Sequence, residues 1–310
     1  MLDFGLVIAR LLHYAATTTL FGASLFPLYA YAGSEPEALG PWQRPLLLRT
    51  AVAAMLSGVL WFVFSAANMA GSLSDLADTE ALWTVVRDTG FGVVWTARML
   101  LAVTIVIVTA MHRSHATTTM RKLVIPIFAA MLLASLAGVG HTQVEGQSAG
   151  FVHVLSDAAH LLAAGAWLGG LIPLAYVLAR HPDTSRDRAA INRVLVKFSG
   201  MGYVAVATLV GSGLINSWFL IGSVSNLLGT PYGRTLLAKL ALFAAMLALA
   251  VANRFWLVPA IGSKRAGAPD DVSAVWLRRL RYHVLGEQLL GAMILLVVSF
   301  LGTMQPAIGQ

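Results

Sequence analysis

The chain has 310 residues, of which 58% are hydrophobic and only 11% charged. A soluble domain carries about 25% charged residues to solvate its surface, so this composition excludes a soluble globular protein and indicates a membrane protein. The formal net charge of +7 comes mostly from short segments between apolar runs, where basic residues report topology, so we expect a lipid bilayer and no nucleic acid as partner.

Long apolar runs predict an all-α fold, a polytopic membrane helix bundle with about eight transmembrane helices. Each run approaches or exceeds the roughly 20 residues that cross a bilayer core, and the short alternating strands of a membrane barrel are missing. We expect the whole chain, 1–310, to form one integral membrane domain. The predicted spans lie near residues 4–32, 48–71, 92–111, 121–139, 151–180, 194–222, 234–257 and 283–303.

The first apolar run is predicted to be a retained span. It lacks a basic leading segment and is much longer than the roughly 7 to 15 apolar residues of a signal peptide. Basic residues concentrate in alternate connections, at 33–50, 112–122, 180–197 and 254–282. The positive-inside rule therefore predicts that these connections are cytoplasmic and that both termini face the outer, periplasmic side.

The fifth predicted span contains two features that shape helix packing. Gly165 and Gly169 form a small-residue face on which a neighbouring helix can pack closely. Pro173 lies one turn further along and is expected to kink the same helix.

The same span carries His153, Asp157 and His160 at its outer end. With about 100° per residue, their side chains fall within roughly 60° of one another and form a stripe on one helix face. The two histidines are roughly 10 Å apart along the axis, too far to share one ion. We therefore expect a site near the mouth, with His153, Asp157 and His141 of the preceding connection, and a deeper position at His160.

Span one offers a partner for the deeper position, because His13 lies in its outer half and is expected to face His160. Arg10, Arg98 and Lys239 add positive charge at the same level and should face the bundle interior or the interface, since a charge in lipid is costly. Each histidine has an alternative role as a hydrogen-bonded packing residue. Glu287 and the following Gln288 fall toward the cytoplasmic side, where they mark either an exit or the membrane interface.

The donor types restrict the chemistry of these positions. The chain has no cysteine, which excludes disulfides and thiolate metal sites. Neutral imidazole with carboxylate suits copper in either oxidation state, Cu+ or Cu2+, and leaves zinc open. Because a histidine must be neutral to bind metal, acid should weaken binding.

Two other functions remain open from these residues. His13 and His160 on facing helices are potential axial ligands of haem in a membrane oxidoreductase. Asp157 is a potential proton site of a carrier for another solute. Neither a phosphate-binding GxxxxGK[ST] motif nor the HEXXH motif of metalloproteases is present, so any pumping must draw on ion or metal gradients, and a metalloprotease is not expected. We predict that the chain is not an enzyme.

The sequence resembles the copper resistance protein D (CopD) family over essentially its whole length. The most specific resemblance is SDAAHLLAAGAWLGGL at 156–171, preceded by Gly140 and His141; ARLLHY at 9–14 also fits. The resemblance implies a bacterial inner-membrane protein that moves copper toward the cytoplasm, often with a small periplasmic copper-binding protein of the CopC type. The metal-handling positions that it implies are His13, His141, His153, Asp157 and His160.

Overall fold

A computed structural model describes residues 2–31, 40–70, 79–111, 119–138, 147–179, 185–262 and 270–309. These ranges are almost entirely helical and contain no strand, as the predicted all-α class requires. The elements in chain order are α1 (Leu2–Ala30), α2 (Gly40–Ala70), α3 (Thr79–Asp88), α4 (Gly90–Met111), α5 (Thr119–Ala134), η2 (Ser135–Gly138), α6 (Gln147–Ala164), η4 (Gly165–Gly169), α7 (Gly170–Ala179), α8 (Ser185–Ile221), α9 (Val224–Gly229), α10 (Pro231–Ala252), η5 (Asn253–Leu257), α11 (Val258–Gly262), α12 (Asp270–Leu301) and η6 (Ala307–Gly309).

Each predicted span coincides with a helix of the structure. Seven helices are long and apolar enough to cross a membrane, and the remaining span corresponds to the shorter apolar helix Lys122–Gly138. Several helices start earlier than predicted: α8 begins at Ser185 and α12 at Asp270. Hydropathy detects only the apolar part of a helix, so polar turns beyond it were predicted as connections.

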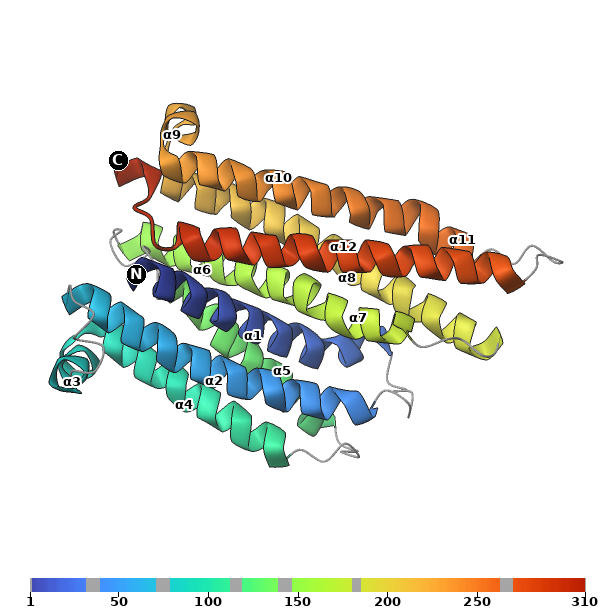
Figure 1. Cartoon of the computed structure of the whole chain (residues 1–310), viewed down its shortest axis with the longest axis horizontal. Helices are drawn as coiled ribbons and strands as arrows, with labels where there is room; N and C mark the ends of the chain where they lie inside the picture. Colours follow the sequence, from blue (N-terminus) through green and yellow to red (C-terminus); the bar gives the residue numbers. More distant parts are fainter. Residues whose placement is uncertain are drawn as a thin grey trace.

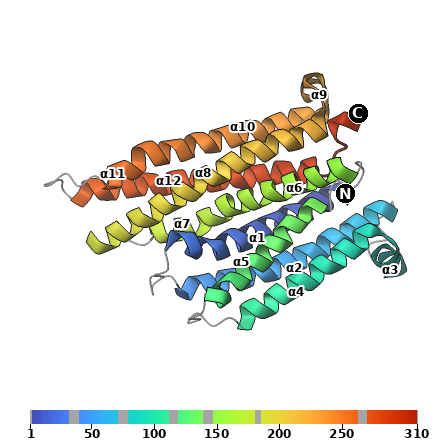
Figure 2. The same cartoon turned by 180° about the vertical axis from the view of Figure 1, so that it is seen from behind.

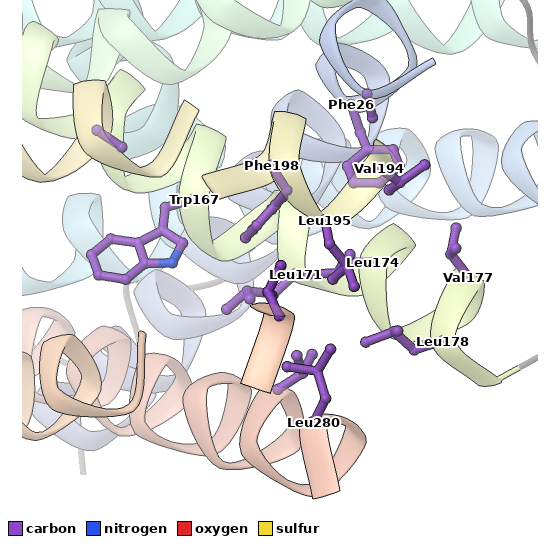
Figure 3. Close-up of a cluster of buried hydrophobic side chains, with 14 of the residues drawn as sticks. Phe26, Trp167, Leu171, Leu174, Val177, Leu178, Val194, Leu195, Phe198 and Leu280 are labelled. Atoms are coloured by element: carbon purple, nitrogen blue, oxygen red, sulfur yellow. The ribbon is translucent and has the colours of Figure 1, made fainter. Parts of the chain in front are cut away.

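The central helix of the bundle is α1. It contacts α2 and α5 as well as η4, α7, α8 and α12. In Figures 1 and 2, α2, α4 and α5 lie on one side of α1, whereas α8, α10 and α12 lie on the other. A buried apolar cluster fills each side, and Figure 3 shows part of the one in which Trp167 and Leu171 pack near Phe198 and Leu280.

The outward faces of the helices carry large apolar side chains. Leu100, Leu214, Trp218 and Leu289 are each 64% to 74% exposed in the isolated chain. An apolar surface of this extent requires an apolar solvent, and lipid tails supply one.

The small-residue face of the fifth span packs on α1, as predicted. A Cβ atom added to Gly22 would lie 2.4 Å from the carbonyl oxygen of Gly165 and 2.4 Å from the carbonyl carbon of Gly169. A Cβ on Gly169 would lie 2.1 Å from the carbonyl oxygen of Thr18. The two backbones therefore approach so closely that a methyl group at either glycine meets main-chain atoms.

Two helices contain a short π-helical segment just before a proline. The segment η4 precedes Pro173, and η5 precedes Pro259. Proline cannot donate the usual backbone hydrogen bond, and its ring clashes with the carbonyl four residues earlier, so the preceding turn widens. The predicted disturbance at Pro173 thus takes the form of a π turn, which contains Trp167.

The start of α1 and the final element η6 lie at the same end of the bundle (Figures 1 and 2). At the opposite end, Arg44 donates a hydrogen bond of 2.8 Å to the Ala110 carbonyl and Arg281 one of 2.9 Å to the Ala179 carbonyl. Both carbonyls belong to the last turns of helices, where basic side chains are stabilising. Basic residues therefore mark the end away from the termini, as the charge pattern predicts.

Candidate functional site

The predicted stripe lines a cavity near the end of the bundle at which the two chain termini lie. This cavity, which we call cavity A, has a volume of about 400 Å3 and is lined by α6, η4, α8, α10 and α12, with Tyr14 from α1. His153, Asp157 and His160 all contribute to its wall. One helix face thus delivers two imidazoles and a carboxyl to a single cavity.

His160 is oriented by α8. Its Nδ1 atom lies 3.0 Å from Ser212 Oγ, and that hydroxyl donates its own hydrogen to the Thr208 carbonyl at 2.5 Å. The Ser212 oxygen therefore accepts from His160 Nδ1–H, which leaves Nε2 as the unprotonated nitrogen. A histidine fixed in one tautomer by a partner on its other nitrogen is the usual form of a metal ligand or proton acceptor.

Asp157 also contacts α8, at Asn216. The amide nitrogen of Asn216 donates a 3.2 Å hydrogen bond to Asp157 Oδ1. The amide oxygen of Asn216 is buried and has no hydrogen-bond partner, although its side chain lines cavity A. A buried acceptor without a partner is costly, so a cation or water beside it would be stabilised.

His153 is held by stacking. Its ring lies 4.7 Å from the Phe219 ring, centroid to centroid, with the planes inclined by 10°, and the residue is 3% exposed. It is thereby packed against α8 at one end of the stripe.

The three predicted cations lie inside the bundle, as expected, and Lys239 is the one beside the stripe. Lys239 of α10 lines cavity A together with Asp157. Arg98 is 1% exposed, and Arg10 lies with its guanidinium carbon 5.0 Å from the centre of the Trp61 ring. These charges face the interior of the bundle, which avoids their exposure to lipid.

The expectation that His13 faces His160 is wrong. His13 Nδ1 lies 3.0 Å from the Ala54 carbonyl, and its Nε2 lies 2.8 Å from an Arg98 nitrogen. Because a guanidinium only donates, Nε2 must accept from Arg98, so Nδ1 carries the hydrogen and donates to Ala54. Both ring nitrogens of this fully buried residue are engaged by α2 and α4, away from cavity A.

The remaining predicted ligand, His141, lies outside the described residues. Within the described ranges, no three His, Asp or Glu side chains are close enough together to hold one metal ion. Whether the predicted positions bind metal therefore stays a prediction. His153 and His160 are too far apart along α6 to share one ion. A three-donor site with Asp157 and one of these histidines would therefore need a further donor, such as His141 or the Asn216 oxygen.

Sequence reasoning did not identify the α8 partners of the stripe. Ser212 and Asn216 each contact a stripe residue more than 50 positions away in the chain. Asn216 could have been identified from the sequence, because a side-chain amide within an apolar span costs free energy unless it has a hydrogen-bond partner.

Two protein-family models match the chain. Residues 1–151 match the family model described as copper resistance protein D-like, N-terminal domain, and residues 192–301 match the one described as copper resistance protein D. No solved structure matches the chain.

Three curated proteins are similar to the chain. It is 33% identical to the copper resistance protein D of Pseudomonas syringae pv. tomato, over 97% of this chain and 96% of that protein. It is 29% identical to the inner membrane protein YebZ of Escherichia coli (strain K12), over 99% and 100%. It is 28% identical to the copper transport protein CutJ of Bacillus subtilis (strain 168), over 89% of this chain and 50% of that longer protein.

The apolar helices and the full-length similarity to an inner membrane protein identify a multi-pass inner-membrane protein. Both family models, together with a relative that is 33% identical over nearly the whole chain, agree on one assignment. The chain belongs to the copper resistance protein D family.

Proposed function

We propose that this protein is a copper-binding membrane permease that moves copper from the periplasmic side toward the cytoplasm, with cavity A as its outer binding site. The observation that carries the proposal is the convergence of His153, Asp157 and His160 on one cavity inside a membrane bundle. The names of two relatives, a copper resistance protein and a copper transport protein, support the choice of metal.

The orientation of the donors supports binding of a cation. His160 presents an unprotonated Nε2, Asp157 has a carboxylate oxygen beyond the one bonded to Asn216, and Asn216 has an unpartnered carbonyl. Imidazole and oxygen donors without thiolate suit either Cu+ or Cu2+. Copper is the cargo, so the site must hold it loosely enough to release it.

A separate supply of copper is part of the proposal. Family resemblance supports a periplasmic copper-binding protein of the CopC type that delivers the ion at the terminal end of the bundle, where cavity A lies. Free copper in the periplasm is the other source. A copper-loaded CopC-type protein that transfers no metal to the purified chain would support the free ion.

Copper per chain is the decisive measurement. Detergent-purified wild type, loaded with copper and desalted, should retain copper in a fixed ratio, whereas folded Asp157→Ala and His160→Ala should lose it. Asp88→Ala is the matched control, because Asp88 is exposed at the end of α3. Equal retention by the wild type and both cavity variants would remove the binding site from the proposal.

Direction needs a second measurement. Cells that express the wild type should accumulate more cytoplasmic copper than cells that express Asp157→Ala at the same protein level. Lower cytoplasmic copper in the wild type would reverse the proposed direction while leaving the site in place.

The two alternative functions predict different results. The geometry of His13 does not support a bis-histidine haem site, since Arg98 already occupies its Nε2; a haem absorption band lost in His160→Ala would favour that function. A proton-coupled carrier of another solute is favoured by solute flux that is independent of copper and lost in Asp157→Asn.

A further inference from the structure

A second cavity lies on the other side of Trp167 from cavity A. This space, which we call cavity B, has a volume of about 350 Å3 and lies toward the basic end of the bundle. Its wall is mostly apolar and comes from η4 and α7, α8, α10 to α11, and α12. The carboxyl in its lining belongs to Glu287 of α12, which is 3% exposed.

Two neutral donors hold this carboxyl. Asn253 Nδ2 donates to Glu287 Oε1 at 2.6 Å, and the side chain of Trp167 donates a second hydrogen bond. The Asn253 oxygen in turn accepts from His283 Nδ1 at 2.8 Å. Because Asn253 uses its nitrogen for Glu287 and its oxygen for His283, its orientation is fixed.

No described cation neutralises Glu287 by contact. The other titratable or charged groups in the lining are Arg254 of η5 and Tyr203 of α8, and Arg254 Nε donates to the Tyr203 hydroxyl at 3.2 Å. His283, one turn before Glu287 on α12, contacts it only through Asn253.

The surroundings of Glu287 make both of its protonation states accessible. An ionised carboxylate in an apolar cavity is expensive, and the two N–H donors offset part of that cost. The neutral acid is inexpensive there. A carboxyl whose neutral and ionised forms have similar free energies exchanges protons readily, as intramembrane carboxyls of transporters do.

The donor set fits a proton better than a metal ion. His283 Nδ1 is engaged by Asn253, and the described residues contain no group of three His, Asp or Glu side chains around Glu287. A copper site of one carboxylate would leave most of the coordination positions empty.

Trp167 belongs to the walls of both cavities. Its side chain lines both cavity A and cavity B, and it lies within the π turn η4 that Pro173 follows. The indole N–H bonds more strongly to an ionised Glu287 than to a neutral one. Ionisation of Glu287 therefore favours one position of a ring that is also part of the wall of cavity A.

We propose that Glu287 is a proton-binding site in cavity B and that Trp167 couples its protonation to the occupancy of cavity A. A proton from water at the basic end forms the O–H bond of the neutral acid, and its loss restores the carboxylate. Coupling is reciprocal, so copper in cavity A changes the protonation of Glu287 to the same extent that protonation changes copper affinity. The coupling rests on the proposed function, whereas the proton site does not.

Infrared difference spectra between acidic and alkaline pH test the proton site without copper. Purified wild type should show a C=O band of a protonated carboxyl in an apolar setting, and Glu287→Gln should lack it. Asp157→Asn, which removes the intramembrane carboxyl of cavity A, should retain it. Glu287→Asp keeps a carboxyl and should shift the band, so it tests the assignment even if the glutamine variant misfolds. Identical spectra in wild type and folded Glu287→Gln would overturn the proton site.

Copper addition at fixed pH tests the coupling. The Glu287 band should change in wild type and stay constant in Trp167→Phe, which keeps an aromatic ring but lacks the N–H donor. An equal change in both proteins would overturn the role of Trp167. If wild type binds no copper, the proposed function fails, but the pH-dependent band still decides whether Glu287 binds a proton. Loss of one copper per chain in Glu287→Gln would instead make cavity B a metal site.

Discussion

The buried pair of His13 and Arg98 shows how a residue that looks like a ligand can serve the fold. Arg98 is 1% exposed, and its guanidinium bonds to the Leu132 carbonyl, to Ser135 and to His13. The Trp95 ring lies 5.2 Å from its guanidinium carbon. A neutral imidazole that accepts from this cation stabilises it without the cost of burying a carboxylate.

We expect His13→Ala to destabilise the protein. The substitution leaves Arg98 without one acceptor in a fully buried site, at a cost of about 1–3 kcal/mol. The thermal unfolding midpoint in detergent should fall further than it does for His160→Ala, whose side chain borders a cavity. Copper per folded chain should be unchanged in His13→Ala, and its loss would return His13 to the metal site.

Lys239 sets the charge balance of cavity A. It lines the cavity that contains Asp157, so under the proposed function an incoming copper ion would meet a positive charge as well as a negative one. Such a residue lowers the affinity for the cargo and favours its release.

Lys239→Met should therefore tighten copper binding. Removing one positive charge several ångströms from the ion is worth on the order of 1–3 kcal/mol at an effective dielectric constant of about 20, or about five-fold to 150-fold in the dissociation constant. Copper titration of the purified protein measures the change. Lys197→Met, at the basic end of α8, is the control and should bind as wild type does; weaker binding in Lys239→Met would contradict repulsion.

At the scale of elements, α1 and the π turn η4 are packed through backbone atoms. The distances at Gly22 leave no room for a methyl group, and its neighbours there are main-chain atoms that cannot rotate away. Since Trp167 lies in η4, this contact also sets the backbone position of the residue that lines both cavities.

Gly22→Ala should reduce both stability and function. Overpacking against backbone costs typically about 1–3 kcal/mol, which a lower unfolding midpoint would report. The matched control is Gly200→Ala in α8, because a Cβ there meets nothing within 4 Å. Replacing that helical glycine should be neutral or stabilise by about 0.5–1 kcal/mol. Equal midpoints for the two variants would show that α1 can shift away from η4.

The helices were more predictable than the contacts between them. Apolar runs located all the spans, since the bilayer imposes their length and composition. Helix α3 was missed because it is amphipathic and lies in a segment with mixed polarity. The face shared by the stripe residues follows from helical geometry, but the partners Ser212 and Asn216 depend on how α8 packs against α6, which periodicity along one helix does not determine.

At the scale of the whole molecule, charge and cavities divide the bundle into two ends. Cavity A lies toward the termini, and cavity B lies toward the basic end that the positive-inside rule assigns to the cytoplasm. Trp167 lines both cavities. Copper that arrives from the periplasm would reach the histidines first and the carboxyl of Glu287 last.

Outer pH should therefore control uptake through the histidines of cavity A. Imidazole binds copper only when its ligating nitrogen is unprotonated, so uptake should fall as the outer side is acidified. Radioactive copper uptake into proteoliposomes at outer pH 5 and pH 7, with the inner pH held constant, measures this effect. His160→Met, whose thioether does not titrate and still binds Cu+, should show a smaller difference between the two conditions. Equal wild-type rates at both values would mean that protons and copper do not compete for the stripe.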